Sequence, residues 1–267
     1  MIKAIVSGAA GRMGGRIIHL MEAAEGITLA GAFERPDHPA VGRDVGEVVG
    51  LPPKGIKVAG SIGEVLEKGE VVIEFTHPEP ALSHLWQVAD AGKAMVLGTT
   101  GFSPAQIGEI HALASRAHLV FAPNMSVGVN LMFKVVSDIA RVLSEGYDVE
   151  IVEAHHRLKK DAPSGTAIKL GQVIAHALGR NLEDVGVYER KGIIGERSKE
   201  EIGVQTVRAG DIVGEHTVLF GGIGERLEII HRAHSRDNFA KGAVRAALWI
   251  VSQPPGLYDM QDVLGLK

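Results

Sequence analysis

The chain has 267 residues, no cysteine and a formal net charge of −4. The absence of cysteine excludes disulfides, thiolate metal ligands and cysteine nucleophiles, and the absence of a basic excess argues against binding to a nucleic-acid backbone. No apolar run approaches the ~20 residues that span a bilayer, and residues 1–6 run directly into glycines without a signal cleavage site. We therefore expect a cytoplasmic protein with neither nucleic acid nor a membrane as its partner.

Short β-branched runs alternate with helical patterns through the first half of the chain. We predict strands at 2–7, 27–33, 71–75, 94–97 and 119–121, and helices at 13–24, 80–91 and 104–117. Continuous apolar strands that alternate with helices are typical of a parallel sheet covered on both faces. The less regular segment 36–63 is expected to be a long loop with one short strand at 56–59.

The pattern changes after Asn124. We predict helices at 127–144, 166–178 and 238–251, and strands at 149–153, 204–208, 216–220 and 226–231. Short glycine-containing turns between the last three strands predict hairpins or a meander. The amphipathic last helix is expected to pack on the first domain. The predicted fold is α/β, with a Rossmann-like parallel-sheet dinucleotide domain at 1–126 and 236–267. An α+β substrate and oligomerisation domain with a mixed sheet is expected at 127–235.

A glycine-rich turn lies between the first predicted strand and the first predicted helix. Glycines in this position let the backbone approach a pyrophosphate, and the helix N-terminus offers free N–H groups. The residues predicted to bind a dinucleotide here are Gly8, Ala9, Ala10, Gly11, Arg12 and Met13. The commonest fingerprint has glycine where Ala9 stands, and a tight turn without a ligand is the alternative interpretation.

Glu34 ends the second predicted strand, and Arg35 follows it. A carboxylate there can accept hydrogen bonds from the ribose hydroxyls of NADH, whereas an arginine can face the 2′-phosphate of NADPH. The two residues favour opposite choices, so we expect NADH or NADPH. For Arg12 and Arg35, a solvated surface side chain is the alternative interpretation.

Two later loops follow predicted strands of the same sheet. In open parallel sheets, ligands bind outside the carboxyl ends of the strands, so both loops are predicted to line the nicotinamide half of the pocket. The residues concerned are Gly98, Thr99 and Thr100 in one loop, and Ala122, Pro123, Asn124 and Met125 in the other. Ordinary turn and helix-capping chemistry is the alternative for each loop.

The most informative stretch is 153–166, in which a strand delivers two histidines, an arginine and two lysines into a turn. A helix then begins, with Ser164 as its expected N-cap. Positive charge that faces a helix N-terminus suits a substrate with two carboxylates. Strand alternation would place His155, Arg157 and Lys159 on one side, unless the turn begins before Lys159. A solvated basic turn is the alternative, and we expect no metal because adjacent strand residues point to opposite faces.

This stretch resembles the signature of the 4-hydroxy-tetrahydrodipicolinate reductase family, formerly called dihydrodipicolinate reductase. The resemblance covers essentially the whole chain and includes residues 8–14, 34–35, 75–76, 98–102, 124, 126–130, 208–217 and 224–229. It implies reduction of a cyclic hydroxy-dicarboxylate by NADH or NADPH with loss of water, in the diaminopimelate route to lysine.

The resemblance also implies roles for individual residues and an assembly. His155 is expected to be the general acid/base, and Lys159 a second proton donor. His156 and the backbone of Gly165 and Thr166 are expected to hold the substrate carboxylates. Family members are homotetramers assembled through the sheet of the second domain, and the same assembly is expected here.

Two other functions remain open at this point. One is another two-domain nicotinamide-dependent oxidoreductase of amino-acid metabolism, such as a homoserine dehydrogenase or a semialdehyde dehydrogenase. The absence of cysteine argues against the semialdehyde dehydrogenase, which needs a thiolate nucleophile. The other is a cofactor sensor without catalysis, which would keep the glycine turn but has no need for the cluster at 155–166.

Overall fold

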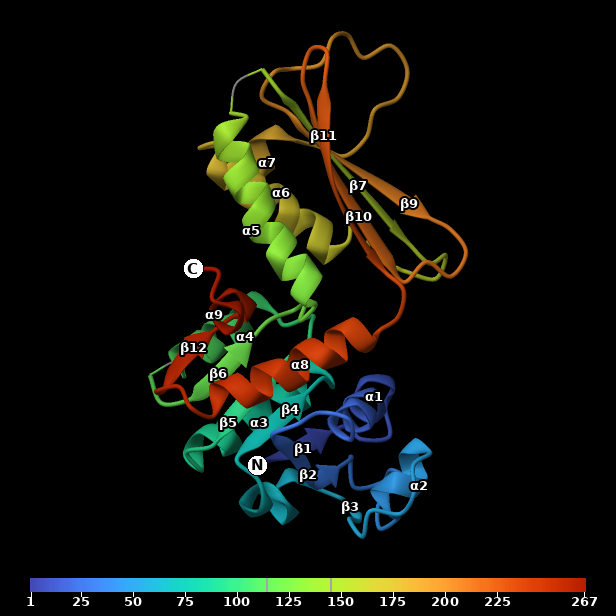
Figure 1. Cartoon of the computed structure of the whole chain (residues 1–267), viewed down its shortest axis with the longest axis vertical. Coiled ribbons are helices and arrows are strands. Elements are labelled where there is room, and N and C mark those ends of the chain that lie inside the picture. The colour runs from blue at the N-terminus through green and yellow to red at the C-terminus, as the bar shows by residue number, and fades with distance from the viewer. Residues whose placement is uncertain (114, 145) are drawn as a thin grey trace. The chain divides into compact units, whose positions relative to one another are not determined.

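The computed structural model describes residues 1–113, 115–144 and 146–267. Within it the chain forms two compact units (Figure 1). Unit 1 consists of Met1–Val127 and Asp237–Lys267, and unit 2 consists of Gly128–Arg236. Two segments far apart in the sequence therefore fold together in unit 1.

Unit 1 contains a seven-stranded sheet with the order β12-β6-β5-β4-β1-β2-β3, and its neighbouring strands are all parallel. The strands are β1 (Ile2–Ser7), β2 (Ile27–Phe33), β3 (Val58–Ala59), β4 (Val71–Glu74), β5 (Ala94–Leu97), β6 (His118–Phe121) and β12 (Gly256–Tyr258). This sheet confirms the predicted Rossmann-like fold. β1 and β4 are neighbours from which the sheet grows in opposite directions, so the switch point of the topology lies between them.

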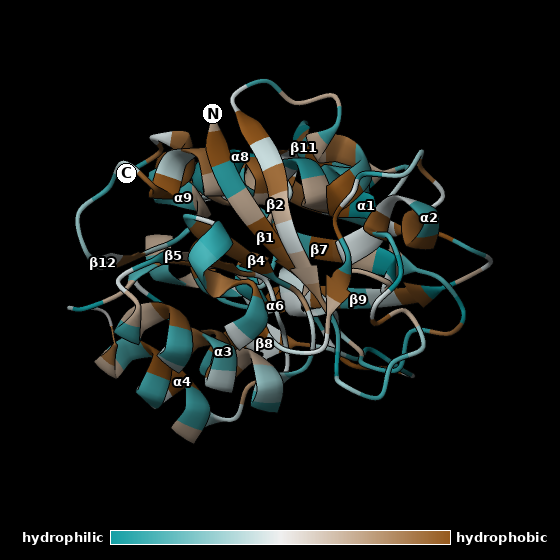
Figure 2. Ribbon diagram, turned by 90° about the horizontal axis from the view of Figure 1, so that it is seen from below, coloured by the Kyte–Doolittle hydropathy of each residue, from teal (hydrophilic) through white to brown (hydrophobic). Residues whose placement is uncertain are grey.

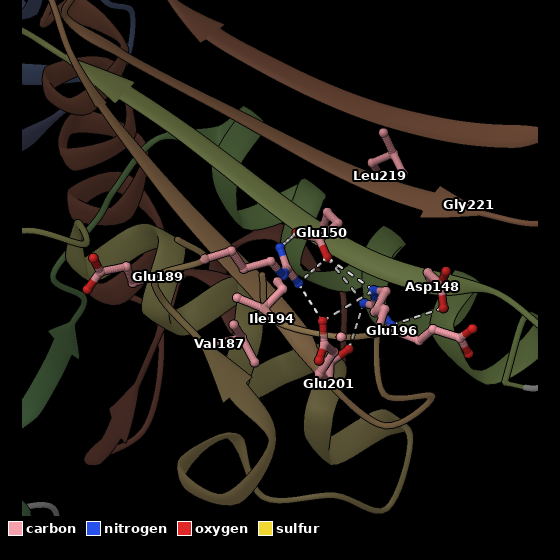
Figure 3. Close-up of a pocket in the computed structure, with 12 residues that line it drawn as sticks. Asp148, Glu150, Val187, Glu189, Ile194, Glu196, Glu201, Leu219 and Gly221 are labelled. Atoms are coloured by element: carbon pink, nitrogen blue, oxygen red, sulfur yellow. Dashed lines mark hydrogen bonds and ion pairs between the residues drawn. The ribbon is translucent and has the colours of Figure 1, made fainter. Parts of the chain in front are cut away.

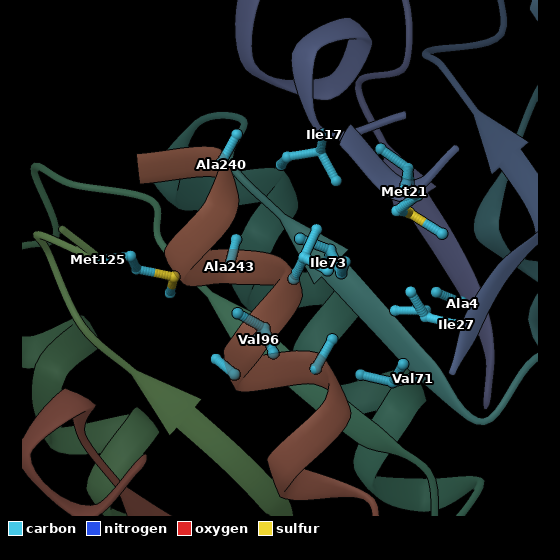
Figure 4. Close-up of a cluster of buried hydrophobic side chains, with 14 of the residues drawn as sticks. Ala4, Ile17, Met21, Ile27, Val71, Ile73, Val96, Met125, Ala240 and Ala243 are labelled. Atoms are coloured by element: carbon cyan, nitrogen blue, oxygen red, sulfur yellow. The ribbon is translucent and has the colours of Figure 1, made fainter. Parts of the chain in front are cut away.

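Helices cover both faces of this sheet. They are α1 (Arg12–Met21), α2 (Val45–Val49), α3 (Pro78–Asp90), α4 (Pro104–Ala112), α8 (Asp237–Ile250) and α9 (Met260–Leu264), with short 3₁₀ turns η1 (Ile62–Glu64) and η2 (Leu66–Lys68). Figure 4 shows Ile17 of α1 and Ala243 of α8 near Ile73 of β4, in the core on one face. In Figure 2, α3 and α4 alternate between hydrophobic and hydrophilic residues, which is typical of helices with one buried face.

Strand alternation explains why the sheet has two cores. Ile73 belongs to the core under α1 and α8, whereas its neighbour Val72 packs with Leu85 of α3 and Ile110 of α4. Successive side chains on a strand point to opposite faces, so a strand buried on both sides must be apolar at every position. Burial of each large aliphatic side chain contributes about 1.5–3 kcal/mol to the stability of the fold.

Part of unit 1 differs from the sequence prediction. The segment 36–63, expected to be a loop, contains the helix α2. Asp44 begins it, because its carboxylate accepts hydrogen bonds from the backbone N–H groups of Gly46, Lys54 and Gly55 at 2.7–2.9 Å. The strand expected at 56–59 is only two residues long, Val58–Ala59. β12 and α9 were not predicted.

Unit 2 contains a five-stranded sheet with the order β11-β10-β7-β9-β8. Its elements are α5 (Val127–Val142), β7 (Asp148–His155), α6 (Gly165–Ala177), α7 (Leu182–Val185), β8 (Gly186–Val187), β9 (Ile202–Arg208), β10 (Gly214–Gly221) and β11 (Arg226–Ala233). β7 is parallel to β9 and antiparallel to β10, which confirms the predicted mixed sheet. The hairpin between β10 and β11 is also confirmed. A hairpin between β9 and β10 is not formed, because β7 lies between them.

One face of this second sheet is covered and the other is open. Val149 and Ile151 of β7 pack with Leu170 and Ile174 of α6 in the core of unit 2. On the opposite face, apolar side chains remain exposed to solvent within the single chain. These are Val152 of β7, Val207 of β9 and Ile230 of β11, with exposed fractions of 39–44%. We call this surface the open face.

Candidate functional site

The predicted cofactor-binding residues of unit 1 gather at one edge of its sheet. Residues 8–13 follow β1, residues 34–35 follow β2, residues 98–100 follow β5, and residues 122–125 follow β6. Because these strands are parallel, their carboxyl ends meet at the same edge, where ligands of open α/β sheets bind. The structure therefore brings the four predicted segments together.

The glycine turn after β1 is tight because its glycines leave no room for side chains. Gly8 has φ +60°, a conformation that side chains disfavour, and its N–H donates to the carbonyl of Phe33 at 3.0 Å. A Cβ on Gly14 would lie 2.1 Å from the carbonyl oxygen of Gly8. Only glycine at position 14 lets α1 begin this close to the turn, so the turn has the compact backbone that a pyrophosphate requires.

Glu34 and Arg35 differ in how firmly they are held. Oε1 of Glu34 accepts a hydrogen bond from the N–H of Ala10 at 2.9 Å, so the carboxylate lies against the glycine turn. The Arg35 side chain is 69% exposed and forms a long ion pair with Asp37, at 3.4 Å. Arg12 is exposed as well. A carboxylate is thus fixed beside the turn, while the arginine can move to meet a ligand.

The loop after β5 presents buried polar groups at the same edge. A Cβ on Gly98 would lie 2.2 Å from the Phe75 ring, so the backbone lies flat against that ring. The hydroxyl of Thr99 is buried and has no hydrogen-bond partner among the described residues, and the same holds for Ser7 at the end of β1. Buried hydroxyls usually find partners. These two, together with the turn, fit an edge that receives a polar ligand such as a dinucleotide.

The loop after β6 contributes side chains to the core of unit 1. The side chains of Ala122 and Met125 belong to the hydrophobic core of unit 1. A Cβ on Gly242 of α8 would lie 1.7 Å from the carbonyl oxygen of Met125, so the helix packs directly on this loop. Pro123 is exposed, and Oδ1 of Asn124 accepts from the N–H of Ser126 at 2.9 Å. Ala122 and Met125 could therefore reach a ligand only through their backbone.

Sequence reasoning missed a buried acid at the end of β4. Glu74 is fully buried, and its carboxylate accepts hydrogen bonds from the N–H of Thr76 at 2.8 Å and from Nδ1 of His84 at 2.7 Å. Thr76 in turn packs against the glycine turn, since its Cγ2 would lie 2.8 Å from a Cβ on Gly8. The signal in the sequence is an acid that directly continues the apolar run of β4.

In unit 2, strand register assembles a second cluster on the helix-covered side of the sheet. Glu153 of β7 lies opposite His216 of β10 and Thr206 of β9, and His155 lies opposite Arg208. Alternation turns all five side chains to the same face. Three strands, β7, β9 and β10, therefore contribute to the cluster. Of these, β7 alone carries part of the stretch 153–166 that the sequence analysis singled out.

Glu153 is the centre of this cluster, and its side chain has no exposed surface. Arg208 donates to both carboxylate oxygens at 2.8 Å, and the N–H of Ser164 donates to Oε1 at 2.9 Å. Burial raises the pKa of Glu153, but the hydrogen bonds from Arg208, His155 and Ser164 outweigh it and lower the pKa to about 2. The carboxylate is therefore ionised at neutral pH.

His155 is held directly by Glu153. Its Nδ1 lies 2.6 Å from Oε2 of Glu153, and its ring meets His216 edge to face with a centroid distance of 5.3 Å. Burial lowers the pKa of His155, Glu153 raises it, and the charges of Lys159 and Arg208 lower it, so the net shift is downward. A neutral imidazole with one nitrogen held by a carboxylate is an arrangement suited to general acid/base chemistry.

His216 connects the cluster to the start of α6. Its Nε2 lies 3.1 Å from Oγ of Ser164, and that Oγ accepts from the N–H of Ala167 at 3.2 Å. This confirms Ser164 as the N-cap of α6. Burial and the nearby His155 lower the pKa of His216 to about 3, so its ring stays neutral. The N-terminus of α6, with Gly165 exposed, lies beside the histidines.

The turn after β7 corrects one prediction. β7 ends at His155, and the N–H of Lys159 donates to the carbonyl of His156 at 3.0 Å, so the chain turns before strand alternation can continue. His155, Arg157 and Lys159 therefore do not share a strand face. Lys159 instead forms an ion pair with Asp161 at 2.9 Å. The carbonyl of Asp161 accepts from Arg208 at 2.7 Å, which ties this turn to the cluster.

A pocket of about 560 Å³ lies elsewhere in unit 2, at the open face (Figure 3). Glu150 of β7 accepts hydrogen bonds from Arg190 at 2.7 and 2.9 Å, and Arg197 donates to the carbonyl of Val149 at 2.9 Å. Arg190 also donates to Glu201 at 2.6 Å. Since both arginines are already paired with carboxylates, this network anchors the segment 188–201 to the sheet.

Among residues 1–113, 115–144 and 146–267, no helix is long and apolar enough to cross a membrane. Within the same residues, no group of three or more histidine, aspartate or glutamate side chains is placed to hold a metal ion.

A Rossmann-type sheet joined to a second unit that carries a histidine and carboxylate cluster fits the class of two-domain nicotinamide-dependent oxidoreductases. Comparison with known proteins identifies the family. Residues 2–125 match the model described as dihydrodipicolinate reductase, N-terminus, and residues 128–264 match the model described as dihydrodipicolinate reductase, C-terminus. The chain belongs to the dihydrodipicolinate reductase family, which confirms the resemblance seen in the sequence.

Individual relatives match over their full length. The chain is 61% identical to the 4-hydroxy-tetrahydrodipicolinate reductase of Syntrophobacter fumaroxidans and 58% identical to that of Syntrophus aciditrophicus, with 100% of each chain covered. A solved structure, dipicolinate-bound dihydrodipicolinate reductase from Paenisporosarcina sp. TG-14, has a TM-score of 0.77 at 26% identity. The match covers 98% of this chain and 98% of that one.

Proposed function

We propose that the chain is an NAD(P)H-dependent reductase that converts 4-hydroxy-tetrahydrodipicolinate to tetrahydrodipicolinate with loss of water, in the diaminopimelate route to lysine. The observation that carries this proposal is the His155 cluster, built by strand register beside the capped N-terminus of α6. Full-length identity of 61% to a relative named for this activity supports it.

The cofactor, NADH or NADPH, is proposed to bind at the carboxyl edge of the sheet in unit 1. Bound there, it supplies the hydride. Residues 8–13 would hold its pyrophosphate, Glu34 and Arg35 its adenosine ribose, and the loops at 98–100 and 122–125 its nicotinamide half. In this proposal, residues 1–126 and 236–267 form the dinucleotide-binding domain, and 127–235 the substrate-binding and tetramerisation domain.

The substrate is proposed to be held by the cluster of unit 2. His156 and the backbone N–H groups of Gly165 and Thr166 would bind its carboxylates, because the N-terminus of a helix attracts anions. His155 would act as the general acid/base, and Lys159 would be the second proton donor. The Paenisporosarcina relative is described as dipicolinate-bound, and dipicolinate is a dicarboxylate of this kind.

The test is steady-state oxidation of NADH and NADPH with enzymatically generated substrate. His155→Ala and Lys159→Ala are expected to lower turnover about 10²- to 10⁴-fold, the usual contribution of a positioned proton donor. His176→Ala, on the exposed far end of α6, and Lys199→Ala, exposed in the same unit, are matched controls that should retain activity. Near-normal turnover in both His155→Ala and Lys159→Ala would contradict the assigned roles.

A cofactor sensor without catalysis is distinguished by binding measurements. Titration of 2,6-pyridinedicarboxylate against the protein with and without NADH should show mutual dependence of the two ligands in a reductase. A sensor that binds only the cofactor should show none.

The proposal extends to assembly and location. The chain is proposed to act in the cytoplasm as a homotetramer joined through the open face of unit 2. The exposed Val152, Val207 and Ile230 support this choice, because clustered apolar side chains on a sheet face mark association surfaces.

A further inference from the structure

We infer that Glu153 and Arg208 are positioning residues for His155: Glu153 keeps the imidazole proton on Nδ1, so that Nε2 is the atom that exchanges protons with substrate. The inference rests on the proposed function, in which His155 is the general acid/base. It adds two residues to which the sequence analysis assigned no role.

The Glu153 carboxylate is held rigidly. Arg208 grips both oxygens in a bidentate pair at 2.8 Å, a geometry that fixes orientation as well as charge. Ser164 donates its N–H to Oε1 at 2.9 Å, and Thr206 donates its hydroxyl to the same oxygen at 3.3 Å. These partners belong to β9 and to the start of α6, and together they hold the carboxylate in one orientation toward His155.

The position of the Glu153 carboxylate sets the tautomer of His155. An ionised carboxylate can only accept hydrogen bonds, so at 2.6 Å the Nδ1 of His155 must be the donor. The neutral ring then carries its lone pair on Nε2. A Cβ on Gly214 would lie 3.1 Å from this Nε2, so the strand opposite presents only backbone to it. Nε2 is therefore the nitrogen left for proton exchange.

Arg208 supports the hydrogen bond between Glu153 and His155. Arg208 donates two of the hydrogen bonds that lower the pKa of Glu153 against the effect of burial, so its loss would raise that pKa and weaken the acceptor that holds the imidazole in one tautomer. Arg208 also donates to the carbonyl of Asp161 at 2.7 Å. Asp161 pairs with Lys159, so one arginine connects the supports of both proposed proton donors.

The charged and titratable groups that face His155 come from several elements. Glu153 belongs to β7 itself, Arg208 to β9, His216 to β10, and Lys159 to the turn after β7. Of these, only Glu153 stabilises the protonated imidazole. Its neutralisation must therefore lower the pKa of His155 further.

The experiment uses Glu153→Gln in the full chain, with Glu150→Gln as the matched control. Glu150 lies on the same strand and also pairs with two arginines, but it faces the opposite side of the sheet. In Glu153→Gln, kcat is expected to fall about 10- to 100-fold, part of the contribution of a general acid/base. KM for substrate should change less than kcat, and the limb of the pH profile that reports His155 should move to lower pH.

A direct readout is the tautomer of His155, followed by the ¹⁵N signals of labelled histidine and assigned by comparison with His155→Asn. The signals should show an unprotonated Nε2 in the native protein and in Glu150→Gln, and a protonated Nε2 in Glu153→Gln. Arg208→Lys keeps the positive charge but cannot form the bidentate pair with Glu153, so it should give an intermediate shift of the pH profile.

The outcomes separate two failures. If Glu153→Gln loses activity but keeps the native pH profile and tautomer, Glu153 has only a structural role and the inference is wrong. If the native chain itself does not oxidise NADH or NADPH with the substrate, the proposed function fails. Should Glu153→Gln not fold, Arg208→Lys decides the question by its pH profile: an intermediate shift supports the inference, and a native profile would overturn it.

Discussion

Replacement of Arg208 by methionine should destabilise unit 2 by about 3–5 kcal/mol at pH 7, the usual cost of leaving one partner of a buried ion pair alone. Two observations set this magnitude. Glu153 has no exposed surface, and its pKa lies at about 2 against an ordinary 4.5. A difference of this size corresponds to about 3 kcal/mol in favour of the folded state when the carboxylate is ionised.

The effect should depend on pH in a defined direction. In the native chain the folded-state pKa of Glu153 is depressed, so its stabilisation is complete above about pH 4.5 and is lost as the pH falls toward about 2. In Arg208→Met, the loss of two hydrogen bonds to the carboxylate would raise the same pKa, so less of this stabilisation would remain at neutral pH. The difference between the two proteins should therefore be larger at pH 7 than at pH 4.

The assay is urea unfolding followed by circular dichroism at both pH values, with hydrogen exchange of β7 and β9 peptides as a local readout. Arg232→Met is the matched control, because Arg232 forms an exposed pair with Glu215 in the same sheet, and the expected change is within about 1 kcal/mol. The double variant Glu153→Gln/Arg208→Met should recover part of the loss. An equal loss at pH 4 and pH 7 would show that packing, rather than the buried charge, is responsible.

Two further predictions concern the cofactor and the assembly. Arg35→Ala should raise KM for NADPH about 10-fold and leave KM for NADH nearly unchanged, because only NADPH offers a 2′-phosphate to the exposed guanidinium. Steady-state kinetics tests this, with Lys57→Ala, an exposed cation of the same unit, as the control. Equal changes of KM for both cofactors would contradict it. Val207→Glu should dissociate the proposed homotetramer by placing a charge on the open face. Light scattering after size exclusion measures the mass, with Glu183→Lys on α7 as control, and an unchanged tetramer would show that another surface is used.

The sheet of unit 1 was predictable because its strands are short apolar runs that end in glycine or polar turns. The predicted ranges 2–7, 27–33 and 94–97 coincide with β1, β2 and β5. β12 was not predicted because its three residues form a strand by pairing with β6. No local sequence pattern indicates this long-range contact. α2 was not predicted because its first turn depends on the Asp44 side chain. That side chain accepts a hydrogen bond from the N–H of Lys54, ten residues further along the chain.

In unit 2 the strands were predictable but their pairing order was not. β9 and β10 follow one another in sequence, which suggested a hairpin, yet β7 inserts between them. The same insertion brings the cluster together, because β9 with Arg208 and β10 with His216 lie on either side of β7 with Glu153. One signal was available, since alternation in β10 places His216 on the buried side with Val218 and Phe220. It identifies a buried histidine but not its partner.

The energetics of the cluster support a chemical rather than a structural reason for its charges. A buried ion pair is a weak source of stability, because apolar side chains of similar volume often stabilise a core as well or better. Unit 2 already has an apolar core formed by β7, β9, β10, α5 and α6, and the charged residues extend it at one end of the strands. What an apolar replacement could not provide is an ionised acceptor for Nδ1 of His155. A well-packed apolar replacement of both Glu153 and Arg208 separates the two reasons. If the ion pair mattered only for folding, this double variant would retain the native pH profile of turnover. If the ion pair sets the tautomer of His155, the double variant would keep its stability, but its pH profile and its turnover rate would change.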